Sequence, residues 1–196
     1  MYEYRRLTDA ERRAVVLDRW LRGVPPHAPP HPPRDAQAYL ITAACFEHRH
    51  IMNTPERRQK LLDLLHESAA PDAVTLAWVA LPNHYHLLVQ TLGLPAFSSV
   101  VRRVHGATSR YWKAEDGTPG RKVWYRFTDR AIRNEAHWFA TLNYIHQNPA
   151  KHGYVRELAE WPNSSVHELL DQYGESQIND WYSSYPVLNM GKGWDD

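Results

Sequence analysis

Two histidines separated by a single residue are the first group in this sequence with the spacing of a reactive site. His84 and His86 lie in the run HYHLLVQT, which has the length and apolar content of a β-strand. Because side chains alternate along a strand, both imidazoles project from one face and Tyr85 projects from the other. Neighbouring imidazoles commonly hold a divalent metal ion, with oxygen ligands completing the shell. Since the chain contains twelve histidines, the pair alone also fits a chance occurrence.

A second candidate is a tyrosine in a segment with helical spacing. At roughly 100° per residue, Trp138, Leu142 and Ile145 fall on one stripe that we expect to be buried. Tyr144 lies on the far side of this helix, on a ridge that it shares with Asn148, one turn further on. The tyrosine is therefore placed to reach a partner outside the core contact of its own helix. An ordinary amphipathic surface aromatic would have the same spacing.

Alternating strand and helix patterns predict the elements that must position these residues. The order is β-α-β-β-α-β-α, and the two middle strands can form a hairpin through Pro82 and Asn83. This order predicts an α+β fold, a ferredoxin-like split βαβ antiparallel sheet with helices on one face. The other face would then be available for function. The predicted strands are 38–46, 73–81, 84–91 and 122–127, and the predicted helices are one that begins after Thr54, one at 96–112 and one at 135–147, stopped by Pro149.

The two ends of the chain differ from its centre in composition. Residues 8–22 begin with a capping-box pattern and predict a short helix, and the next twelve residues hold six prolines, which favour an extended arm. We do not assign the two histidines of that arm, His27 and His31, to a metal site. The sequence therefore divides into an N-terminal helix and proline-rich arm (1–36), a central domain (37–165) and an acidic C-terminal tail (166–196).

The composition is that of a globular protein and excludes several classes. Apolar residues make up 43% of the 196 residues, and eight are tryptophans. The single cysteine, Cys45, excludes an intramolecular disulfide and a cysteine-based zinc site. No run approaches the roughly 18 apolar residues of a membrane span, and the N-terminus carries charge throughout. We therefore expect a cytoplasmic protein.

Charge is distributed unevenly along the chain, although the formal net charge is only +1. Residues 100–133 hold nine basic and three acidic residues, whereas residues 156–196 hold two basic and eight acidic residues. The first stretch suits phosphate backbones, and the second could compete with DNA for it. Solvated helix faces would show the same basic run. The predicted DNA-binding residues are Arg102, Arg103, Arg110, Lys113, Arg121, Lys122, Arg126, Arg130 and Arg133, interleaved with the aromatic residues Tyr111, Trp112, Trp124, Tyr125 and Phe127.

Three segments together give a specific resemblance: ALPNHYHLLVQT, RAIRNEAHWFATLNYIHQNPAKHGYV and EWPNSS. They closely resemble the REP-associated tyrosine transposases, relatives of the single-tyrosine HUH transposases, over roughly residues 38–165. The family motif His-hydrophobic-His matches His84-Tyr85-His86, and the motif Tyr-Ile-His-x-Asn-Pro starts at Tyr144 and ends at Pro149. Tyr85 is a departure, because a plain aliphatic residue is expected there, but the spacing of the histidines is kept.

The resemblance implies an HUH nuclease core that cleaves and rejoins single-stranded DNA next to palindromic REP-like hairpins. In that scheme Tyr144 attacks the phosphodiester, forms a 5′-phosphotyrosine and releases a 3′-hydroxyl. His84, His86 and Asn148 hold Mg²⁺ or Mn²⁺. His137 and His146 are the candidates for proton acceptor, and His137 is better placed by its helical angle. A bacterial, cytoplasmic and nucleoid-associated protein is implied.

Two rival readings stay open. One is a protein of the same fold that binds a DNA hairpin without cutting it. The other is an unrelated metal enzyme, but no His-x-His-x-Asp-His extension and no His-Glu-x-x-His helix occur. The sequence leaves open the hairpin sequence, the tetranucleotide at the cleavage site, the metal used in the cell and the choice between monomer and homodimer.

Overall fold

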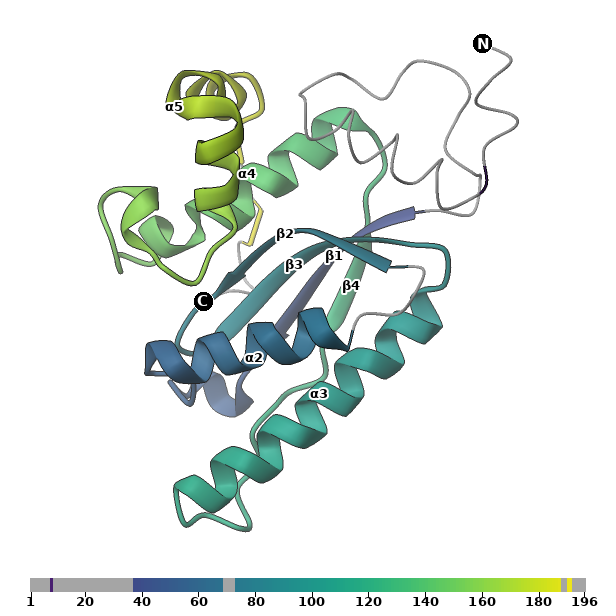
Figure 1. The fold of residues 1–196 in the computed structure, drawn as a ribbon, viewed down its shortest axis with the longest axis vertical. Coiled ribbons are helices and arrows are strands. Elements are labelled where there is room, and N and C mark those ends of the chain that lie inside the picture. The colour runs from purple at the N-terminus through teal and green to yellow at the C-terminus, as the bar shows by residue number, and fades with distance from the viewer. Residues whose placement is uncertain (1–7, 9–36, 69–72, 188–189, 192–196) are drawn as a thin grey trace.

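A four-stranded antiparallel sheet forms the centre of the computed structural model (Figure 1). The structure describes Thr8 and residues 37–68, 73–187 and 190–191, so the predicted N-terminal helix and proline-rich arm lie, Thr8 apart, outside the described residues. The strands are β1 (Gln37–Ala44), β2 (Ala73–Ala80), β3 (His84–Thr91) and β4 (Thr128–Ala131), in the order β2-β3-β1-β4. All neighbouring strands pair antiparallel.

Helices cover both faces of this sheet. The two connecting helices of the βαβ unit, α2 (Pro55–Glu67) and α3 (Leu94–Glu115), pack on one face, as predicted (Figure 1). The helices α4 (Glu135–Lys151) and α5 (Val166–Ser184) pack on the other. The predicted α+β split βαβ fold class is confirmed. The second face is not open to solvent, however, because α4 lies on it. Two short 3₁₀ turns, η2 (Phe46–His48) and η3 (Leu158–Glu160), complete the described elements.

The alternation of side chains along β3 separates two apolar cores. Tyr85, Leu87 and Val89 belong to the cluster formed with α2 and α3. Leu88, one residue out of step, belongs to the cluster formed with α4 and α5. Every residue of β3 is buried, as expected for a strand that is covered on both faces. His84 and His86 have the same parity as Leu88, so they face α4.

The predicted proline stop of α4 is wrong. The helix begins after Asn134, whose side-chain oxygen accepts a hydrogen bond from His137 N (2.8 Å) and caps it. The helix continues through Pro149 to Lys151. Proline removes one backbone donor, but the last turn still forms, because His152 N donates to Asn148 O (3.1 Å). Gly153, at φ 72°, then ends it in the left-handed conformation that glycine adopts without strain.

Two further segments differ from the sequence-based expectation. The last strand is residues 128–131 and not 122–127: Trp124 makes only an isolated bridge with Cys45, and its ring is buried in the core. The residues expected as an acidic tail, 166–196, include helix α5. Its apolar residues, among them Trp181, pack against α4, and Asn143 Nδ2 of α4 donates to Trp181 O (3.0 Å). No helix in the described part of the chain is long and apolar enough to cross a membrane.

Candidate active site

The two motifs of the sequence meet where α4 crosses β3. Tyr144 Oη lies 3.3 Å from His86 Nε2, and Asn148 Oδ1 lies 2.9 Å from His84 Nε2. Asn148 comes one helical turn after Tyr144, so the two side chains reach the two histidines in parallel. All four side chains are buried, with 2% or less of each exposed. The ridge of Tyr144 therefore faces the sheet, not solvent.

His86 is held by a hydroxyl on the neighbouring strand. Thr42 of β1 is the pairing partner of His86, and its Oγ1 lies 2.8 Å from His86 Nδ1. When Nδ1 carries the proton and donates it to Thr42, the lone pair of Nε2 faces the Tyr144 hydroxyl. Thr42 is thus a positioning residue that the sequence-based prediction missed. Only the pairing register of β1 with β3 identifies Thr42 as the partner of His86, and the sequence motifs do not reveal that register.

His84 lies between two side-chain oxygens. Its Nδ1 is 2.8 Å from Asn83 Oδ1, and its Nε2 is 2.9 Å from Asn148 Oδ1. Burial lowers the pKa of His84 to about 3, so the ring is neutral near pH 7 and carries one proton. That proton serves one of the two oxygens, and the other nitrogen directs a lone pair at an oxygen. Such an arrangement of acceptors suits a cation.

Burial also sets the charge state of the second histidine. The pKa of His86 lies well below its usual range, first because the ring is desolvated and then because His84 lies beside it. The two ring centroids are 5.0 Å apart. Both imidazoles are therefore neutral at neutral pH, which is the form that binds metal ions.

Two residues at the end of α4 border the same site. Lys151 is exposed, and its Nζ lies 5.4 Å from the centroid of the Tyr144 ring. The ring of His152 is half-buried and lies 5.0 Å from that of His84, centroid to centroid. The sequence-based prediction did not include either residue. The signal for His152 was its position four residues after Asn148, on the continuation of the same helical ridge.

The two predicted proton acceptors lie elsewhere on α4. His146 is buried with its Nε2 2.8 Å from Ser165 Oγ, and burial lowers its pKa to about 3. His137 is in the first turn, where its Nδ1 accepts a hydrogen bond from Arg133 N (3.2 Å). Seven residues along a helix separate it from Tyr144 by about 10 Å. The imidazole that contacts the Tyr144 hydroxyl is that of His86, and the roles of His137 and His146 stay predictions.

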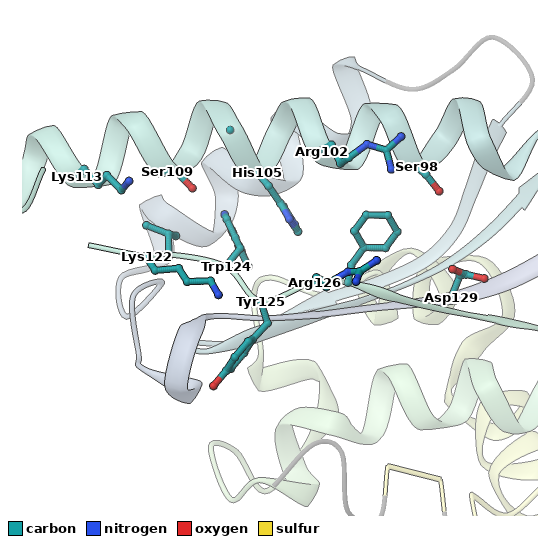
Figure 2. A pocket seen from close by; sticks show the side chains of 13 residues that line it. Ser98, Arg102, His105, Ser109, Lys113, Lys122, Trp124, Tyr125, Arg126 and Asp129 are labelled. Carbon is teal, nitrogen blue, oxygen red and sulfur yellow. The ribbon is translucent and has the colours of Figure 1, made fainter. Parts of the chain in front are cut away.

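The predicted basic residues divide among several places. Four of the nine line one groove of about 600 Å³ between α3 and residues 122–129, which we call the α3 groove (Figure 2). Arg121 instead forms an ion pair with Asp116 (2.5 Å), and Arg130 lines a separate pocket beside His137. Arg103 and Arg110 are exposed on α3, and Arg133 precedes α4. The four groove residues are Arg102, Lys113, Lys122 and Arg126.

The aromatic residues near the α3 groove also divide. Trp112 and Trp124 are buried in the core, whereas Tyr111 and Tyr125 are 56% and 38% exposed. Lys122 Nζ lies 5.7 Å from the centroid of the Tyr125 ring. The two tyrosines are therefore the most exposed aromatic residues of this stretch, and the half-buried Phe127 lines the groove.

Two known proteins are similar to this chain in sequence. The chain is 36% identical over 94 residues to the REP-associated tyrosine transposase of Escherichia coli K12, a match that covers 46% of this chain. It is 32% identical over 120 residues, 55% of this chain, to a Haemophilus influenzae protein provisionally given the same name. The matches span 53% and 65% of these relatives' own lengths. No protein-family model matches the chain.

A solved structure is also similar. It is that of a REP-associated tyrosine transposase bound to a REP hairpin, at 27% identity and a TM-score of 0.51, covering 67% of this chain and 78% of the other. Both chains contain a mixed α/β fold, and in this chain the antiparallel sheet presents a His-x-His pair to a tyrosine on a helix. The chain is similar in sequence and in fold to proteins named REP-associated tyrosine transposases.

Proposed function

We propose that this chain is a metal-dependent transposase that nicks and rejoins single-stranded DNA next to REP-like hairpins through Tyr144. The observation that carries the proposal is the contact of the Tyr144 hydroxyl with His86 Nε2 at 3.3 Å, directly beside the pair of His84 and Asn148. The names of the relatives and the hairpin in the similar structure support the substrate class. The organism of the E. coli relative is consistent with a bacterial protein.

The donor set suits a divalent cation that accepts both nitrogen and oxygen ligands. His84 Nε2, His86 Nε2 and Asn148 Oδ1 would supply two nitrogens and one amide oxygen, and His84 Nε2 lies 2.9 Å from Asn148 Oδ1. In this proposal the third protein ligand is the amide of Asn148, whose Oδ1 lies 2.9 Å from His84 Nε2. A set without carboxylate leaves positions for water and phosphate oxygens, as Mg²⁺ and Mn²⁺ require.

The reaction follows from the position of Tyr144. Its oxygen forms a bond to phosphorus, the bond from phosphorus to the 3′ oxygen breaks, and the phenol proton is lost as the bond forms. The released 3′ oxygen takes up a proton and becomes a 3′-hydroxyl, and the 5′ phosphate stays on Tyr144. A bound divalent ion would supply positive charge for the non-bridging oxygens. The 3.3 Å contact with His86 Nε2 places the hydroxyl beside the proposed ligands, and a bound ion would take the Nε2 lone pair in place of the hydroxyl hydrogen. The reversal of the same steps rejoins the strand.

We expect the DNA to contact basic residues on both faces of the sheet, next to its edge strand β4. The α3 groove offers four cations to phosphates, and the exposed rings of Tyr111 and Tyr125 offer stacking surfaces to unpaired bases. Arg103, Arg110, Arg130 and Arg133 extend this surface. Arg121 contributes less, because its guanidinium is paired with Asp116.

One observation favours a second candidate, a protein that binds hairpins without cutting them. Tyr144 is only 1% exposed, and a nucleophile must reach a phosphate in solution. Lys151 is the exposed residue beside the Tyr144 ring. If the protein is a nuclease, the side chains around Lys151 have to move when DNA binds, so that the phosphate can reach Tyr144. A binding protein needs no such movement.

Adduct formation separates the two candidates. The protein is incubated with labelled REP-like hairpins carrying single-stranded flanks, with Mg²⁺, Mn²⁺ or EDTA, and then denatured. We expect a covalent protein–DNA adduct that requires the metal and is abolished in Tyr144→Phe. Tyr111→Phe, at an exposed tyrosine, is the matched control and should keep the adduct. Tight binding without an adduct under any of these conditions would establish the binding protein instead.

A further inference from the structure

One acidic residue lies in the α3 groove among its four cations. Asp129 is the only acidic residue among the thirteen that line the groove (Figure 2). Figure 2 shows Lys113 and Lys122 at one end and Arg102, Arg126 and Asp129 toward the other, with His105 between them. A carboxylate here weakens the attraction of the groove for phosphate, so its presence in a DNA-binding surface calls for a reason.

The strand register puts this carboxylate on the groove side. Asp129 of β4 pairs with Ile41 of β1, and Ile41 belongs to the core on the α2 and α3 face. Arg130, the next residue, pairs with Leu40 and points to the α4 face. Successive residues of β4 thus direct one negative and one positive side chain to opposite faces.

No structural partner explains the carboxylate. Asp129 is exposed, and among the described residues its side chain makes no ion pair or hydrogen bond, although Arg102 and Arg126 line the same groove. Arg102 instead donates to Ser99 Oγ (2.9 Å). The acceptor oxygens of Asp129 are therefore available to a ligand that brings its own donors.

We propose that Asp129 reads a nucleobase, with guanine as the preferred base, at the arginine end of the α3 groove. This inference rests on the proposed DNA-binding function. Unpaired bases expose their Watson–Crick edges, and only guanine presents two adjacent donors there, N1–H and the N2 amino group. A carboxylate accepts both at once. Arg102 and Arg126 would hold the flanking phosphates, and the Phe127 ring, which also lines the groove, offers apolar surface to the base.

Binding to short single strands tests this inference without any cleavage. The probes are labelled dT15 strands with one central dG, with deoxyinosine at that position, which lacks the N2 amino group, or with dT only. Fluorescence anisotropy is measured in EDTA. We expect the protein to bind the dG strand on the order of ten-fold more tightly than the deoxyinosine strand. Asp129→Asn should remove most of that preference, and it should bind the dT-only strand at least as tightly as before.

Matched variants distinguish the effect of a lost negative charge from the loss of base recognition. Asp171→Asn, at an exposed position of α5, makes the same change in charge and should keep the preference for dG. Arg126→Ala should weaken binding to all three strands and lower the salt slope by about 0.7. Equal binding of the dG and deoxyinosine strands by the unaltered protein, or an unchanged preference in Asp129→Asn, would overturn the inference. A failed adduct assay would instead overturn the nuclease and leave this readout standing.

Discussion

At the scale of single residues, the site depends on how neutral side chains hold one another. His86 has a hydroxyl on each ring nitrogen, from Thr42 and from Tyr144, so its orientation depends on both β1 and α4. His84 is fixed in the same way by two amides, from Asn83 and Asn148. The motif residues were predictable from the sequence, because each motif is local. Thr42 was not predictable as a partner, because a motif contains no information about which side chain lies on the next strand. Asn83 directly precedes His84, but the sequence does not show that its side chain turns back to the ring.

Replacing the Thr42 hydroxyl should weaken the proposed metal site. In Thr42→Val the Nδ1 proton of His86 loses its acceptor, so the ring is no longer held with Nε2 toward the ligands. We expect the metal concentration at half-maximal adduct formation to rise roughly 10-fold to 100-fold. The measurement is adduct yield against Mn²⁺ concentration. Thr128→Val is the control, because Thr128 is the exposed partner of Thr42 on the other side of β1. A metal dependence in Thr42→Val that equals that of the control would contradict this role.

At the scale of elements, local patterns predicted most of the fold. The alternation of β2 and β3 and the spacing of α2, α3 and α4 gave the order of elements and the face of the histidine pair. The errors came from tertiary contacts. Residues 122–127 have a strand-like composition, but Trp124 packs into the core instead of continuing a ladder, and pairing starts at Thr128. Residues 166–184 were expected as tail because of their charge, yet Trp181 and Ile178 are buried against α4.

The N-cap of α4 should contribute to stability without entering the chemistry. Asn134 Oδ1 accepts from His137 N, and Asn134→Ala removes that acceptor. We expect a loss of about 1 kcal/mol in the free energy of unfolding. Asn134→Asp keeps an acceptor and should unfold close to the unaltered protein. Denaturant titration at pH 7 measures both. Adduct formation at saturating metal should be unchanged in both variants, since Tyr144 lies about three turns from the cap. A loss of stability in Asn134→Asp as large as in Asn134→Ala would contradict the capping role.

At the scale of the whole molecule, buried neutral histidines are distributed through both cores. Burial lowers the pKa of His84 and of His146 to about 3 and that of His105 to about 4. His105 packs on the α3 side, where its Nε2 contacts Tyr85 Oη (2.8 Å) and its ring stacks on Trp124. His146 lies on the α4 side. A fall in pH should therefore destabilise both cores.

The free energy of unfolding should fall as the pH falls below about 6.5. An unfolded histidine takes up a proton near pH 6.5, whereas these folded ones stay neutral to about pH 3 to 4. The unfolded state therefore binds more protons in this window. Their contribution to stability is fully present above pH 6.5 and is lost toward pH 4. Each residue adds a slope of about 1.4 kcal/mol per pH unit.

The variant His146→Gln isolates one of these contributions. Urea unfolding at pH 7, 6 and 5 should give a pH slope smaller by about 1.4 kcal/mol per unit than that of the unaltered protein. His105→Gln should reduce the slope by a similar amount. The slope is the informative quantity, because either variant can also lower stability equally at every pH. Identical slopes in the variants and the unaltered protein would show that the folded rings take up protons over the same pH range as unfolded histidines.

The placement of Tyr85 between His84 and His86 has a consequence for how this protein can vary. On β3 the site and the core of α2 and α3 are interleaved residue by residue. One inserted or deleted residue at the start of the strand would turn every later side chain to the other face. Both imidazoles would enter an apolar core, and Tyr85 would enter the site. Variation in this strand is therefore confined to substitutions, and changes in length have to be absorbed by the connections on either side of it.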